Sequence, residues 1–115
     1  MLVYRVENAE GIGPYKVHPK PNSIMELCEA HNSSRAHPAP GTDPGLGVFM
    51  HKDYFCGFVS EAALKKWFHG WRKHLRTARF HMAIYQARKV LVSKYTGQVI
   101  FKKDLATRTK TLPVP

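Results

Sequence analysis

Apolar positions recur at two different periods along this chain, and the periods predict strands and helices. Residues 2–7 (LVYRVE) alternate between two faces, which predicts a strand. Residues 54–59 (YFCGFV) are apolar almost throughout and predict a strand at the centre of a sheet. Further strands are expected over 80–86, 89–94 and 98–102, with a tight Tyr95-Thr96-Gly97 turn before the last of them.

Helical spacing is clearest over residues 61–76. Its apolar residues fall on one face, and Ser60 stands where a side chain would cap the first turn. Those apolar residues are Leu64, Trp67, Phe68, Trp71 and Leu75. Gly70 weakens this helix and marks a bend. A shorter helix is predicted over 23–31, where Ser23 and Glu26 match a capping box.

These elements predict one α+β domain over residues 1–104, with an antiparallel or mixed sheet covered mainly by the 61–76 helix. Residues 105–115 are expected to form a C-terminal tail. Residues 32–47 are rich in Pro and Gly and form a long loop, which in a compact domain is usually functional or mobile.

Composition places the chain among ordinary globular proteins. The 115 residues are 43% hydrophobic and 23% charged, and no apolar run is long enough to span a membrane. The two cysteines imply neither a disulfide framework nor a zinc site, and the first residues lack the pattern of a signal peptide. We therefore expect a reduced, soluble protein of the cytoplasm, with no membrane partner.

Charge is divided unequally between the two halves. Residues 1–60 hold five Lys/Arg and six Asp/Glu, whereas residues 61–115 hold thirteen and two, a net charge of +11. This asymmetry predicts an anionic partner, either nucleic acid or an acidic protein surface. The candidate binding residues flank the apolar stripe of the predicted helix: Lys65, Lys66, Arg72, Lys73, Arg76 and Arg79. An extension could run through Lys89, Lys94, Lys102 and Lys103, and on to Arg108 and Lys110.

No motif in the sequence predicts a catalytic centre. The aromatic residues of the helix are at core spacing, and Trp71 lies nearest the edge of the stripe. Seven histidines show no zinc-finger or H-x-x-x-H pattern, so we predict no metal and no other cofactor, although the loop histidines leave a metal site open. The loop histidines are His18, His31, His37 and His51.

Several short motifs resemble a small family of accessory proteins encoded by bacteriophages and prophages. The motifs are VYRVEN (3–8), GIGPY (11–15), HPAP (37–40), YFCGFVSEAALKKWF (54–68) and QVIFKK (98–103). The resemblance implies a protein that is not an enzyme and that inhibits or modulates a host complex, by occluding a nucleic-acid-handling or defence machine. The partner would be a host protein or ribonucleoprotein complex in the cytoplasm of the host cell. Direct DNA or RNA binding is the alternative, and the oligomeric state stays open.

A weaker resemblance is to ADP-ribosyltransferases. Arg5 in a first strand and Ser60 at the start of a helix match two positions of that family's layout. Gln98 stands where the family has a glutamate, and an amide cannot supply the charge that such a carboxylate provides. This resemblance implies NAD binding. The residues themselves also allow simpler roles, since Ser60 can cap a helix and Arg5 can pair with Glu7.

Overall fold

The computed structural model describes residues 1–32, 35–40, 42–46 and 53–115, and within them the chain forms one six-stranded sheet and three α-helices. The elements in chain order are β1 (Leu2–Glu7), α1 (Asn22–Asn32), β2 (Tyr54–Phe58), α2 (Glu61–Trp67), α3 (Arg72–Thr77), β3 (His81–Ala87), β4 (Leu91–Val92), β5 (Gln98–Lys102), the 3₁₀ turn η1 (Lys103–Leu105) and β6 (Ala106–Pro113). All pairings are antiparallel, in the order β4-β5-β2-β1-β3-β6. The predicted α+β class is confirmed, and β2 is central as expected.

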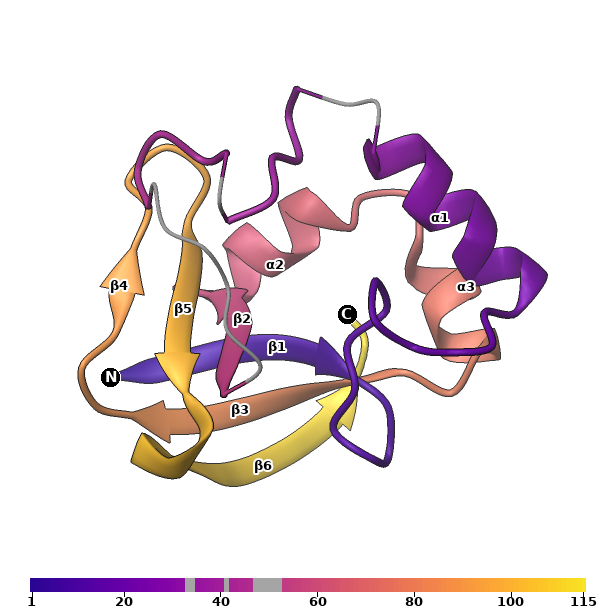
Figure 1. Cartoon of the computed structure of the whole chain (residues 1–115). Coiled ribbons are helices and arrows are strands. Elements are labelled where there is room, and N and C mark those ends of the chain that lie inside the picture. The colour runs from indigo at the N-terminus through magenta and orange to yellow at the C-terminus, as the bar shows by residue number, and fades with distance from the viewer. Residues whose placement is uncertain (33–34, 41, 47–52) are drawn as a thin grey trace.

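The sheet consists of two halves, β4-β5-β2 and β1-β3-β6, whose strands run across each other (Figure 1). β1 pairs with β3 along its whole length, whereas its pairing with β2 consists of Tyr4 opposite Phe58. Gly57 lies at this junction. A Cβ there would lie 2.6 Å from Val3 Cγ1 and 2.9 Å from the Tyr4 carbonyl oxygen. The two halves therefore meet this closely because residue 57 has no side chain.

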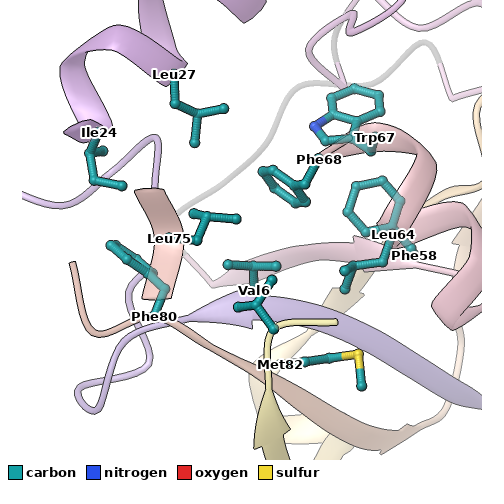
Figure 2. Close-up of a cluster of buried hydrophobic side chains, with 11 residues drawn as sticks. Val6, Ile24, Leu27, Phe58, Leu64, Trp67, Phe68, Leu75, Phe80 and Met82 are labelled. Carbon is teal, nitrogen blue, oxygen red and sulfur yellow. The ribbon is translucent and has the colours of Figure 1, made fainter. Parts of the chain in front are cut away.

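The three helices cover one face of the sheet and enclose the main hydrophobic core (Figure 2). α2 packs on β1 and β2, and α1 packs on α3. Helical side chains meet Val6 and Met82 of the sheet in this core, together with the linking Phe68. The buried apolar residues of the helices are Ile24, Leu27, Leu64, Trp67 and Leu75. Their burial confirms that the apolar stripe predicted from periodicity faces the core.

A second core lies on the opposite face, where both halves of the sheet contribute. Val3, Ala83 and Tyr85 come from β1 and β3, and Val99 and Phe101 come from β5. All five are buried, although no helix packs over them in the described part of the chain. Because one half of the sheet runs across the other, this face closes over its own side chains.

The single helix predicted over 61–76 is wrong, because the structure has two helices in its place. α2 ends at Trp67 and α3 begins at Arg72, with Gly70 between them at φ +86°. This left-handed conformation favours glycine and cannot continue a helix, so the helix is interrupted here and not merely bent as expected. The Ser60 cap is confirmed, since its side chain accepts a hydrogen bond from Ala63 N.

The expected C-terminal tail is also wrong, because β6 forms the outer strand of the sheet beside β3. Its side chains are mostly exposed, and Val114 just beyond it is buried in the main core. A polar edge strand carries no alternating apolar signal, although its threonines favour β structure. Two smaller differences are that β4 is shorter than the predicted 89–94 strand and that α1 begins one residue before Ser23.

The close contact at the sheet junction predicts that Gly57→Ala destabilises the fold by about 2–3 kcal/mol, the usual cost of overpacking. Gly70→Ala is the matched control, because an added Cβ there meets nothing within 4 Å and only the positive φ opposes it. We expect the control to lose about 1 kcal/mol. Urea unfolding of both variants measures the difference. An equal or smaller loss for Gly57→Ala would contradict the steric role of this glycine.

Candidate functional site

Six exposed cations lie on and directly after α2 and α3, and we call them the basic helical surface. They are Lys65, Lys66, Arg72, Lys73, Arg76 and Arg79. The burial of Leu64, Trp67 and Leu75 on the inner side turns the cationic positions outward. Arg76 is the most constrained of the six, because its Nε donates to the Val114 carbonyl oxygen at 2.8 Å. The break at Gly70 distributes the six over two short helices and the turn after them.

No carboxylate in the described residues forms an ion pair with this surface. The ion pairs among the described residues join Arg5 to Glu7, Arg108 to Glu7, and His74 to Glu26. Glu7 and Asp43, two of the chain's eight acidic residues, are fully buried within the fold and present no charge to the surface. The positive charge of the second half therefore remains directed outward.

The six residues predicted to extend this surface lie on different elements, with Arg108 and Lys110 in β6. Lys94 belongs to the β4–β5 turn, Lys102 ends β5 and Lys103 begins η1, while Lys89 precedes β4. The Nζ atoms of the first three lie 5.5, 5.7 and 4.6 Å from the ring centroids of Tyr95, Tyr54 and Phe55, respectively. A hollow of about 260 Å³ is lined by Lys102 and Lys103 but also by Asp53 and Asp104. These residues therefore lie apart from the basic helical surface, and Lys102 and Lys103 share their region with two aspartates.

A buried ion cluster crosses four neighbouring strands on the face of the sheet that carries the second core. The Arg5 guanidinium donates from Nε to Glu7 Oε1 at 3.0 Å, from Nη1 to the Cys56 carbonyl at 2.7 Å, and from Nη2 to the Gly11 carbonyl at 3.1 Å. Glu7 also accepts from the Tyr85 hydroxyl at 2.7 Å and from Arg108 at 3.1 Å. Burial and the Glu7 carboxylate together raise the pKa of Tyr85. The interpretation that Arg5 pairs with Glu7 is confirmed.

Arg5, Ser60 and Gln98 come from three adjacent strands or their ends. Arg5 lies in β1, Ser60 follows β2, and Gln98 begins β5, opposite Phe58. Their side chains make separate contacts. Ser60 caps α2, and the Gln98 amide donates to Asp43 and to the Pro38 carbonyl, both at 2.9 Å. The Gln98 oxygen accepts from the Cys56 thiol, whose pKa burial raises to about 11.

Asp43 is the centre of a polar cluster that the sequence analysis missed. Its carboxylate is fully buried and accepts hydrogen bonds from Thr96, from Ser93 at 2.7 Å, from Gly45 N at 2.8 Å and from Gln98. Burial opposes ionisation, but these four donors outweigh it and lower the pKa of Asp43. The cluster joins the long loop to the β4–β5 turn. Ser93, Thr96 and Gln98 follow Asp43 by 50 to 55 residues in the sequence, so no local pattern could identify the cluster.

His31 and His37 form a stacked pair inside the helical layer, and His31 lies in α1 and not in a loop as expected. The rings of His31 and His37 lie 3.8 Å apart and are nearly parallel. Trp67 Nε1 donates to the Tyr15 hydroxyl at 2.7 Å, and that hydroxyl is bonded to His31 Nδ1. His37 Nε2 is bonded to the Trp67 carbonyl at 2.8 Å. His51 lies outside the described residues, within which no group of three or more His, Cys, Asp or Glu side chains could hold a metal.

The stacked pair makes folding sensitive to pH. Burial, and secondarily His37, lowers the pKa of His31 to about 4 from its ordinary value of 6.5. Between pH 6.5 and pH 4, His31 therefore binds a proton in the unfolded chain but stays neutral in the folded chain. Stability should be complete above pH 6.5 and fall by up to about 3 kcal/mol as the pH decreases to 4.

Chemical denaturation across this pH range measures the effect. In His31→Asn, which keeps a polar atom near Nδ1 but does not titrate, most of the decrease should disappear. His18→Asn, a change of an exposed histidine, should retain the decrease of the natural protein. An identical pH dependence in His31→Asn and the natural protein would exclude His31 as its source.

Comparison with known proteins identifies a family. None of the described helices has the length and apolar character needed to cross a membrane. No curated protein and no solved structure matches the chain. The family model described as bacteriophage T4 Y00F protein matches residues 1–115, the whole length of the chain. The predicted kinship with small phage-encoded proteins is thus confirmed, and this chain belongs to the bacteriophage T4 Y00F protein family.

Proposed function

We propose that this protein is a phage accessory protein that binds an anionic surface of a host nucleic-acid-handling or defence complex. The observation that carries the proposal is the basic helical surface, whose six exposed cations have no ion pair with a carboxylate of the described residues. Like charges held close together repel one another until an external anion approaches them. Binding to such an anion relieves this repulsion and releases counterions.

The proposed mode of action is occlusion. The protein is compact, with a radius of gyration of 13.0 Å and extents of 35 × 30 × 26 Å. A stable protein interface covers about 800 Å² on each partner, which a domain of this size can provide on one side. A bound copy would therefore exclude another ligand from the same anionic surface. This action requires no catalysis.

An anionic host complex is favoured over free single-stranded nucleic acid. Single-strand binding commonly uses exposed aromatic rings on which bases stack. Trp67 and Phe68, the aromatic residues closest to the cations, are only 7% and 5% exposed. Trp71 is partly buried against the same core. The helical surface therefore offers charge with little stacking area, which suits a carboxylate-rich protein or the phosphates of an assembled complex.

The proposal predicts that reversing Lys66, Arg72 and Lys73 to Glu weakens partner binding by at least about 100-fold and leaves unfolding cooperative. The natural protein and this variant are used as baits in host lysate, with and without nuclease. Reversing Lys16, Lys20 and Arg35, which lie outside the candidate binding residues, changes the net charge equally and is the control. Unchanged capture by the first variant would contradict the site assignment.

Comparing capture with and without nuclease distinguishes the main proposal from the alternative of direct nucleic-acid binding. Under the main proposal the captured assembly survives nuclease, and a gel-shift assay with free DNA or RNA gives no shift. A direct binder instead shows a shift whose affinity decreases steeply with salt. Such a shift, with capture lost after nuclease, would replace the main proposal by the alternative.

NAD binding is a second candidate, favoured by the placement of Arg5, Ser60 and Gln98. These three positions, widely separated in sequence, lie in or next to the adjacent strands β1, β2 and β5, although their side chains make separate contacts. Arg5 lies beside the loop of the GIGPY motif, where a Cβ on Gly13 would lie 3.3 Å from Nη2. Glycine at this position thus lets the loop backbone approach the buried guanidinium closely. The amide of Gln98 is bonded within the protein, so this candidate concerns binding without turnover.

Calorimetric titration with NAD tests this candidate. We expect measurable binding at millimolar NAD and its loss in Arg5→Lys, which retains a charge but not the three-sided hydrogen bonding of guanidinium. Because Arg5 also joins β1 to β2, the loss of binding counts only if circular dichroism shows that the variant keeps the fold of the natural protein. Absence of any heat signal for the natural protein would eliminate NAD as a ligand.

A further inference from the structure

The outer edge of β4 combines exposed apolar side chains with cations. Leu91, Val92 and Tyr95 are 49%, 39% and 65% exposed, which is unusual for large apolar residues so close together. Exposed cations lie just before these residues and between them; the cations are Arg88, Lys89 and Lys94. The sequence has no Asp or Glu between Glu61 and Asp104. We call these six residues the β4 edge surface.

The register of β4 shows which shape of partner this surface fits. Leu91 lies opposite Ile100 and Val92 lies opposite Val99 on β5, so the two aliphatic side chains point to opposite faces of the sheet. A flat surface placed on one face would reach only one of them. An extended segment alongside the strand reaches both, because its own side chains also alternate between faces.

The hairpin that carries this surface is held in place before any partner arrives. Ser93 and Thr96 donate to the buried Asp43, and Ser93 N donates to the Gln98 carbonyl at 2.8 Å. The Lys94 Nζ lies 5.5 Å from the centroid of the Tyr95 ring. Binding therefore requires little ordering of this edge, which preserves affinity.

We propose that the β4 edge surface binds an extended acidic segment of a partner protein, which adds beside β4 as a further strand. The edge backbone supplies hydrogen bonds, Leu91, Val92 and Tyr95 supply apolar contacts, and the flanking cations select carboxylates. Aliphatic side chains gain little from phosphates, so a protein suits this edge better than nucleic acid does. A second copy of the chain is disfavoured because each copy has a net charge of +10. The short, lysine-flanked edge also disfavours pairing with neutral strands.

A library of random 12-residue peptides displayed on yeast tests the proposal. Selection on the natural protein should enrich acidic peptides with alternating apolar residues. The combined variant Leu91→Ser, Tyr95→Ser should bind them at least tenfold more weakly. Met25→Ser removes an equally exposed apolar residue from α1 and should retain full affinity. A bound synthetic peptide should slow amide hydrogen exchange in β4, the signature of strand addition.

Three outcomes would overturn the proposal. The first is selection of peptides without acidic enrichment, and the second is binding that the combined variant leaves unchanged. The third is displacement of the peptide by an oligonucleotide. The variant with Lys66, Arg72 and Lys73 reversed should still bind the peptide, so the result is independent of the function proposed for the helical surface.

Discussion

The buried cluster around Arg5 and Glu7 is the interaction on which the arrangement of this sheet depends. Arg5 reaches β2 through the Cys56 carbonyl, and Glu7 reaches β3 through Tyr85 and β6 through Arg108. One ion pair on β1 thereby contacts strands of both halves of the sheet. Removing a buried ion pair from water costs several kcal/mol, which good geometry and further hydrogen bonds must offset. Arg5 donates hydrogen bonds to three acceptors and Glu7 accepts hydrogen bonds from three donors, which offsets the cost of their burial.

The helical layer builds on this sheet and determines where the cations lie. Ser60 fixes the start of α2 directly after β2, and Trp67 and Leu75 anchor α2 and α3 in the core. Gly70 separates the two helices while both retain their buried stripe. The basic helical surface is therefore a consequence of core packing. The same burial that fixes the aromatic residues leaves the intervening lysines and arginines in solvent.

Sequence patterns predicted the elements that have one clear periodicity. β1 and β5 match their predicted limits because their alternation is read directly from the chain. The division of the second helix was missed because Trp71 and Leu75 continue the same 3.6-residue spacing beyond Gly70. β6 was missed because an edge strand exposed on both faces has no apolar alternation. The outward position of the helical cations was predictable from the apolar stripe. The Asp43 cluster was not, because it joins residues brought together only by the tertiary fold.

The fold increases the charge imbalance that the sequence already contains. Glu7 is paired with Arg5 and Arg108, and Asp43 is enclosed by neutral donors, so neither carboxylate balances the cations of the basic helical surface. A compact protein with a net charge of +10 carries a cost of self-repulsion. Distributing acidic residues among the surface lysines would relieve that cost without changing the core. The chain instead has no acidic residue between Glu61 and Asp104, the region that supplies the basic helical surface and the β4 edge surface. A partner that brings its own negative charge relieves the repulsion when it binds, which makes the unfavourable free surface a source of affinity.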